Sequence, residues 1–218
     1  MTTTTAVPSK PFSWQIALGA EGIAGFQFAR CGFDVSVLSG PNKPWYDLLV
    51  AKADNLLKVA VKGSDDGGWS QIDSYLNRAA DLSGNKNSYE GAIDLWLDHH
   101  GSRTVCCLVQ FEGVAIDELP RMYLASPSEI APILRESAER LGTSTLYEKY
   151  EWKSGASGMV QSLPLTWAFS AQRVQELLGG YTAKPQPRRV LPKRYGIAAI
   201  WPASAVVPRI SYAKGAAA

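Results

Sequence analysis

The residue types best suited to a chemical role in this chain are a carboxylate and an ammonium group, Asp47 and Lys62. Asp47 belongs to segment 46–51 (YDLLVA) and Lys62 to segment 56–63 (LLKVAVKG); both segments are typical of β-strands, and residues 53–55 predict a tight turn between them. The start of one strand and the end of the next therefore meet at one edge of a sheet. Such a pair suits metal-assisted phosphodiester hydrolysis, because the aspartate can hold a divalent cation while the lysine orients or deprotonates water and offsets charge in the transition state.

Two elements before this hairpin are expected to position a third group. Residues 13–31 carry apolar side chains at helical spacing, and Gly32 stands where that helix would end. Residues 33–38 (FDVSVL) alternate and predict a strand. Glu21, inside the helix, would join Asp47 and Lys62 if the helix packs over the sheet. Taken singly, each of the three could be an ordinary turn, strand-end or helix-surface residue, but their joint order and spacing favour a site.

This arrangement resembles a known superfamily. A helix with Glu21 (GAEGIAGFQFARCGF), a strand, YDLLV, a turn and VAVKGS look like the core of the PD-(D/E)XK nucleases, in particular the archaeal Holliday-junction resolvases and intron homing endonucleases. The resemblance covers residues 13–64 well and extends loosely through the helix with AIDLW at 92–96, but it does not cover the C-terminal third. It implies a restriction-endonuclease-like core, with Glu21, Asp47 and the backbone carbonyl of Val61 as ligands of Mg²⁺ or Mn²⁺ and Lys62 as the catalytic lysine.

One position departs from the family pattern. Two residues before Lys62, where the family has Glu, Asp or Gln, this chain has Ala60, whose methyl group cannot bind a hard cation. The chain could be a deliberately inactivated variant, a natural nuclease-like protein that binds DNA without cutting it, or an enzyme whose acid has moved to another position. Candidates for the moved acid are Asp65, Asp66 and Glu112. We favour inactivation, because Glu21, Asp47 and Lys62 all remain.

The rest of the chain predicts further helices and strands. Residues 87–100 read as a helix, 103–111 as a buried strand and 121–125 as a strand paired with it. Ser126, Pro127 and Glu129 form a capping-box pattern that predicts a helix to about residue 141, and a strand at 147–152 and a helix at 170–178 follow. This order predicts an α/β fold with a mixed sheet.

Three regions are expected along the chain: a flexible N-terminus (1–12), an α/β domain (13–180, with its core at 13–112 and added elements at 113–180) and a basic, proline-containing extension (181–218). The extension contains seven basic residues and no acidic one, which leaves 15 of the 22 basic and all 20 acidic residues for residues 1–180, a net charge of −5. Such a segment suits a polyanion, although it could also solubilise the chain or bind an acidic partner subunit. We expect DNA contacts from Lys184, Arg188, Arg189, Lys193 and Arg194, and from Trp69 in a glycine-rich loop, which could instead touch a second subunit.

Composition excludes several classes of protein. With 218 residues, 46% of them hydrophobic and 19% charged, the chain can form a proper core, and it has no apolar run long enough to span a membrane. The N-terminus lacks a secretory-signal pattern, and three cysteines cannot make a disulfide framework, so a cytoplasmic location is expected. The adjacent His99 and His100 cannot face one way on a helix, and a third histidine is absent, which excludes a histidine-rich zinc site.

The sequence thus favours a metal-dependent DNA endonuclease that acts as a homodimer or higher oligomer, because two sites are the simplest way to cut both strands. Ala60 supports the alternative of a non-catalytic nuclease-like module that binds DNA or a protein. A third possibility is an assembly subunit whose basic arm binds an acidic neighbour.

Overall fold

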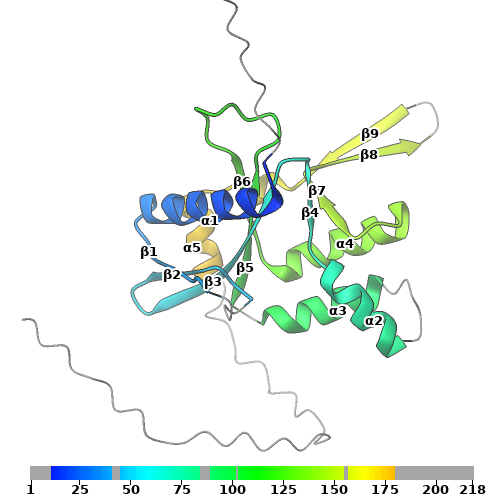
Figure 1. Cartoon of the computed structure of the whole chain (residues 1–218), viewed down its shortest axis with the longest axis horizontal. Helices are drawn as coiled ribbons and strands as arrows, with labels where there is room; N and C mark the ends of the chain where they lie inside the picture. Colours follow the sequence, from blue (N-terminus) through cyan, green and yellow to red (C-terminus); the bar gives the residue numbers. More distant parts are fainter. Residues whose placement is uncertain (1–10, 41–44, 84–88, 102, 155–156, 180–218) are drawn as a thin grey trace, which may run out of the picture. The chain divides into compact units, whose positions relative to one another are not determined.

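The computed structural model of the chain describes residues 11–40, 45–83, 89–101, 103–154 and 157–179 (Figure 1). Of the expected flexible N-terminus only residues 11 and 12 fall within these ranges. The basic extension, 181–218, lies outside the described residues.

A mixed five-stranded sheet forms the centre of the described domain. Its strands lie in the order β1 (Asp34–Val37), β2 (Leu48–Lys52), β3 (Asn55–Ser64), β5 (Thr104–Gln110) and β6 (Arg121–Ala125). Only β3 and β5 pair in parallel, and every other neighbouring pair is antiparallel. The α/β class with a mixed sheet, predicted from the order of elements, is therefore confirmed.

One face of this sheet is covered by α1 (Ser13–Arg30) and α5 (Ala171–Gly179). Alternate residues of β3, including Val59 and Val61, point into this core, which we call the α1-side core. Gly63 lets the helix approach closely, since a Cβ at that position would lie 2.8 Å from the carbonyl oxygen of Ile16. The helix ends at Arg30, with Cys31 as its C-cap, and Gly32, near which the end was expected, has a φ of 79°.

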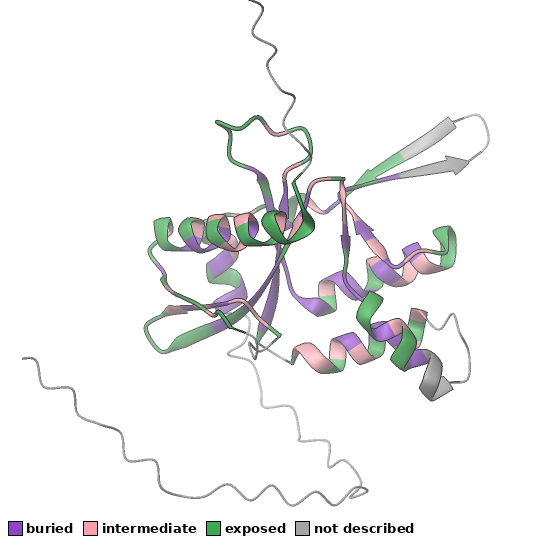
Figure 2. Cartoon of the chain, viewed as in Figure 1, coloured by how far each residue is buried: buried purple, intermediate pink, exposed green. Residues whose placement is uncertain are grey.

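The opposite face carries α2 (Asp73–Ser83), α3 (Tyr89–His100) and α4 (Pro127–Leu141). Their apolar side chains pack with Cys106 and Leu108 of β5 in a second core, the α3-side core. Figure 2 shows the buried residues concentrated along the central strands between the two layers of helices. Side chains of β3 that alternate with Val59 and Val61, namely Ala60 and Lys62, therefore face the α2–α3 side.

Smaller elements complete the domain. Strand β4 (Gly68–Ser70) pairs with β7 (Thr145–Tyr147), and β8 (Lys149–Ser154) pairs with β9 (Ser157–Ser162), before the short helix η1 (Leu165–Trp167). The capping box of α4 is present as predicted, with the Ser126 hydroxyl accepting from the Glu129 amide. The glycine-rich loop expected around Trp69 is replaced in part by β4. In place of the single strand expected at 147–152 the structure has β7 and β8.

None of the helices within the described ranges combines the length and the apolar character needed to cross a bilayer.

Candidate active site

The hairpin of β2 and β3 fixes the position of Asp47. This residue directly precedes β2, and its amide donates to the Val59 carbonyl at 2.8 Å, so it extends the ladder between the two strands. Its Oδ2 accepts a hydrogen bond from the Val61 amide at 2.7 Å. The carboxylate is thus held against β3 beside Ala60 and Lys62.

Asp47, Ala60 and Lys62 line one pocket of about 180 Å³. Trp45, from the segment before β2, also lines it. The rest of the lining comes from α2, α3 and the residue pair before α2, and consists of Gln71, Ser74, Tyr75, Trp96 and His100. The structure therefore brings together three residues that the sequence singled out: the aspartate, the lysine, and the alanine at the position where an acid or glutamine was expected. Lys62 is exposed and Ala60 is buried, which places the methyl group in the interior of the pocket and the ammonium group near solvent.

Three polar atoms of this pocket are buried without a hydrogen-bond partner among the described residues. They are Gln71 Nε2, Tyr75 Oη and His100 Nδ1, and they make up three of the four such side-chain atoms in the described part of the chain. Leaving a buried polar group unpaired costs about 1–3 kcal/mol, so these three atoms require partners, which ordered water or a ligand would supply.

Sequence reasoning did not single out Gln71 or Tyr75, and it interpreted His100 only as a residue near the end of a helix. Gln71 lies two residues before α2 and Tyr75 in its first turn, so no helical repeat places the two together. No local signal places His100 with them. It reaches the pocket only because α3 packs across the sheet, with Trp96 in the α3-side core.

Burial sets the protonation state of the aromatic groups in the pocket. It lowers the pKa of His100 to about 4, with further lowering by His99 and Lys62, so the imidazole is neutral at pH 7. Burial also raises the pKa of Tyr75 against the opposing effect of Arg78, which keeps its phenol protonated. Cys106, in the strand beside Ala60, is fully buried; burial raises the pKa of its thiol to about 12 and makes it a poor nucleophile.

The metal ligands that the resemblance implies do not all meet here. Glu21 lies on α1, which packs on the other face of the sheet, and it does not line the pocket. Val61 contributes its amide to Asp47, while its side chain lies in the α1-side core. Among the described residues, no group of three or more His, Cys, Asp or Glu side chains is arranged to hold a metal ion. The pocket thus offers a metal ion one carboxylate, Asp47, and one imidazole, His100.

The acids considered as replacements at position 60 lie elsewhere. Asp65 and Asp66 line a separate cavity of about 460 Å³ near the start of α1, which also touches Lys62. Glu112 lines a third cavity of about 800 Å³, together with Asp66. None of the three lines the pocket of Asp47 and Ala60.

Trp69 requires a correction. We expected it in a loop, in contact with DNA or a second subunit, but it lies in β4 with 2% of its surface exposed. Its Nε1 donates to the Val109 carbonyl at 3.3 Å, and its ring packs edge-on against Tyr123. The pairing of β4 with β7 turns the indole into the α3-side core, so the ring has no surface to offer to DNA. The other expected DNA contacts (Lys184, Arg188, Arg189, Lys193 and Arg194) lie outside the described residues.

The chain matches no protein-family model, no curated protein and no solved structure. Evidence on its function therefore comes from this pocket and from the sequence.

Proposed function

We propose that this pocket is a nuclease-type site for the metal-dependent hydrolysis of phosphodiester bonds in DNA. The observation that carries the proposal is the position of Asp47, whose carboxylate accepts from the Val61 amide at 2.7 Å in the same pocket as Lys62. The two strands of one hairpin thus present a cation ligand and a positive charge in one pocket.

The order of elements supports a restriction-endonuclease-like core for this site. Helix α1 precedes the three strands β1, β2 and β3, and β5 follows α3 and joins β3 in parallel. The resemblance implies this order, with a glutamate-bearing helix, three strands, and then a helix and a strand.

The chemistry assigns different roles to the two residues. Asp47 would hold Mg²⁺ or Mn²⁺, which would polarise the phosphate and activate water. Lys62 would orient the attacking water and offset the charge that develops on phosphate oxygens. The side chain of Ala60 supplies no oxygen, so we expect the chain to hydrolyse DNA slowly or not at all with alanine at this position.

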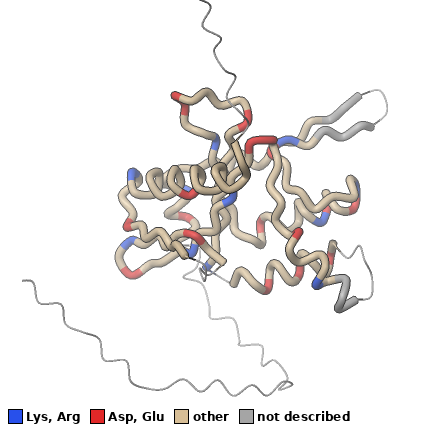
Figure 3. The backbone as a smooth tube through the Cα atoms, in the orientation of Figure 1, with Lys and Arg blue, Asp and Glu red and all other residues tan. Residues whose placement is uncertain are grey.

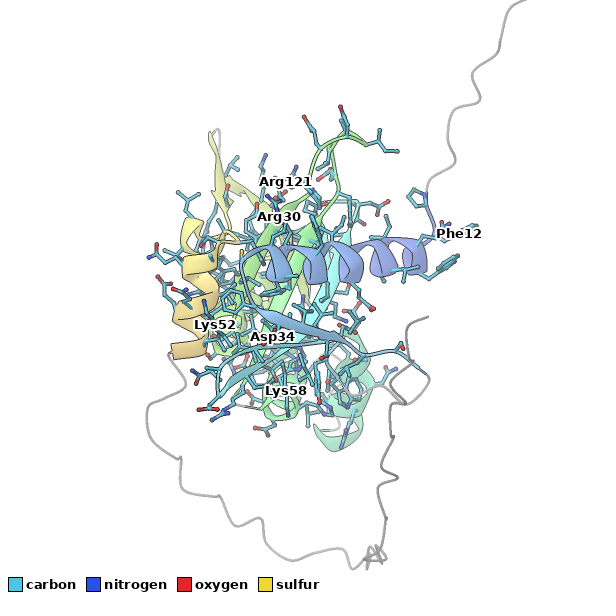
Figure 4. The ribbon with its side chains drawn as sticks, turned by 90° about the vertical axis from the view of Figure 1, so that its left-hand side faces the viewer. Phe12, Arg30, Asp34, Lys52, Lys58 and Arg121 are labelled. Atoms are coloured by element: carbon cyan, nitrogen blue, oxygen red, sulfur yellow. The ribbon has the colours of Figure 1, made fainter. Side chains whose placement is uncertain are left out.

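A non-catalytic DNA-binding module is the second candidate, and Ala60 is the observation that favours it. In either case we propose that the basic extension binds DNA phosphates. We also propose a homodimer. The exposed apolar side chains of α1 and its N-cap support it, since Phe12, Trp14, Leu18 and Phe26 are each more than half exposed, and Figure 4 shows Phe12 at the start of the helix, away from the sheet.

A cleavage assay tests the proposal. Plasmid, linear and four-way-junction DNA are incubated with Mg²⁺ or Mn²⁺ and with the parent chain, Ala60→Glu or Ala60→Gln. We expect the substituted chains to cut at least about a hundredfold faster than the parent. The matched control is Ala60→Glu combined with Asp47→Asn, which keeps the new acid but removes the cation ligand and should be inactive.

Two other results are informative. If no variant cuts but all shift DNA in a gel, the binding module is correct and the nuclease proposal is wrong. If no variant cuts DNA and none binds it, both candidate functions are wrong and the resemblance to nucleases concerns the fold only. Mass measurement in solution, with and without DNA, tests the homodimer.

A further inference from the structure

We propose that His100 and Asp47 together bind a divalent transition-metal ion, such as Mn²⁺, Co²⁺ or Zn²⁺, in the pocket beside Ala60. The inference deepens the proposed function, because it concerns the same pocket and names the metal ligand that replaces the missing acid. It can be tested without DNA, so the two proposals can fail separately.

The position of the His100 ring supports this inference. Its ring packs edge-on against Trp96 with 5.0 Å between centroids, and its carbonyl accepts a hydrogen bond from the Thr104 hydroxyl at the start of β5. These contacts fix the end of α3 and the plane of the imidazole, yet Nδ1 is buried without a partner among the described residues. The ring of His99, the preceding residue, packs against Trp45 and Tyr75, with 4.2 and 5.9 Å between centroids, and lies 6.4 Å from the His100 ring.

The donor set favours some metals over others. Mg²⁺ prefers oxygen ligands, and here Asp47 is the only carboxylate that lines the pocket in the described structure. An imidazole nitrogen combined with a carboxylate oxygen suits first-row transition ions. His100 would therefore take over the ligand position that a glutamate would fill at residue 60, and it would shift the preference of the site away from Mg²⁺.

The other unpaired atoms fit the same account. Gln71 Nε2 and Tyr75 Oη are hydrogen-bond donors in the pocket, and water molecules bound to a metal ion accept hydrogen bonds from such groups. A hydrated transition-metal ion in the pocket would thus have hydrogen-bond donors among the residues that line it. The ammonium group of Lys62 repels the cation and lowers the affinity, but it lies at the exposed side of the pocket.

The chain contains only two histidines, which makes a direct test possible. The full chain, free of any histidine tag, is labelled with ¹⁵N-histidine and titrated with Zn²⁺, and the ring nitrogens are observed by NMR. We expect the His100 Nδ1 resonance to move strongly at stoichiometric Zn²⁺, while the His99 resonances, whose nitrogens do not bind the ion, move much less. The shift should disappear in Asp47→Asn. Unmoved His100 resonances at saturating Zn²⁺ would overturn the inference.

Calorimetry with matched variants gives a second readout. His100→Phe keeps an aromatic ring against Trp96 but removes the nitrogen, and we expect it to weaken Mn²⁺ binding at least about tenfold. His99→Phe should leave it unchanged. Ala60→Glu should raise Mg²⁺ affinity whether or not His100 is present. Equal Mn²⁺ affinity of His100→Phe and the parent would contradict the inference.

The results separate the two proposals. Metal binding through His100 without DNA cleavage by any variant leaves the inference standing and removes the nuclease function. If Ala60→Glu cleaves DNA and His100→Phe binds metal as the parent does, the nuclease function stands and the inference about His100 is wrong. If His100→Phe does not fold, the NMR titration of the parent chain still decides.

Discussion

Ala60 has the smallest side chain among the residues that line the pocket, and polar groups lie around it. It is 4% exposed, and Gln71, Tyr75 and His100 line the same pocket with unpaired buried atoms. A longer polar side chain on β3 would extend into this space, because alternate residues of the strand face the α2–α3 side. The polar lining therefore suits a hydrogen-bonding side chain at position 60 better than a methyl group.

The stability of substituted chains tests this complementarity. Ala60→Gln should raise the free energy of unfolding by about 1 kcal/mol, because the amide can pair with at least one of the buried polar atoms. Ala60→Met is the matched control, since it fills a similar volume without a strong hydrogen-bonding group. Urea denaturation of the three chains measures the difference. If Ala60→Met is as stable as Ala60→Gln or more so, the gain comes from filling the pocket and not from hydrogen bonds to its polar atoms.

At the scale of single residues, the sequence could predict only local parts of the site. Asp47 and Lys62 belong to one hairpin, so their meeting follows from strand direction and a tight turn. His100 enters the pocket from α3, and no pattern in the neighbouring sequence shows that packing. Trp69 was wrongly expected to be accessible because a glycine-rich segment suggests a loop, whereas its pairing with a strand from residues 145–147 buries the ring.

A buried carboxylate, Glu148, links the segment between β7 and β8 to strand β6. It lies between β7 and β8 and accepts from Arg121 on β6 through both oxygens, at 2.7 and 2.9 Å. Tyr123, also on β6, donates to it at 2.6 Å. Burial raises the pKa of Glu148, but the hydrogen bonds from Arg121 and Tyr123 outweigh burial and hold that pKa below the ordinary 4.5. The fold is therefore stabilised by the ionised form.

The sign of this shift predicts the pH dependence of stability. The stabilising effect is fully present above the unfolded-state pKa of about 4.5 and is lost as the pH falls through the lower folded-state value. Glu148→Gln should therefore lose about 1–3 kcal/mol of unfolding free energy at pH 7, and the difference from the parent should shrink towards about pH 3. Denaturant titrations at both pH values measure it, with Glu139→Gln on the exposed surface of α4 as control. A difference that does not depend on pH would contradict the assignment to the ionised carboxylate.

Element boundaries could be predicted where short-range chemistry sets them. The start of α4 follows from Ser126, Pro127 and Glu129, whose capping contacts lie within one turn of the chain. By contrast, β4 is three residues long and exists through its pairing with β7, far away in sequence. Helix α2 was missed entirely, because its apolar residues Tyr75, Leu76 and Ala79 make only a short helical repeat.

At the scale of the whole molecule, charge is divided between the described domain and the extension. Figure 3 shows acidic and basic residues intermixed over the described domain. Several of its arginines have acidic partners, such as Arg135 with Glu90 and Asp94. The extension has no acidic residue to neutralise its seven basic ones. The sequence predicts this division fully, because it depends on composition and not on folding.

The salt dependence of DNA binding tests the role of the extension. Replacing Arg188, Arg189, Lys193 and Arg194 by Gln should reduce the slope of log affinity against log salt concentration by about 0.9 for each DNA phosphate that the variant no longer neutralises. Arg135→Gln is the control and should leave the slope unchanged, since acidic groups already neutralise that guanidinium. Fluorescence anisotropy over a range of salt concentrations gives both slopes. If the fourfold variant keeps the parent slope but changes the mass of the protein in solution, the basic segment binds an acidic subunit rather than DNA, because counterion release requires binding to phosphates.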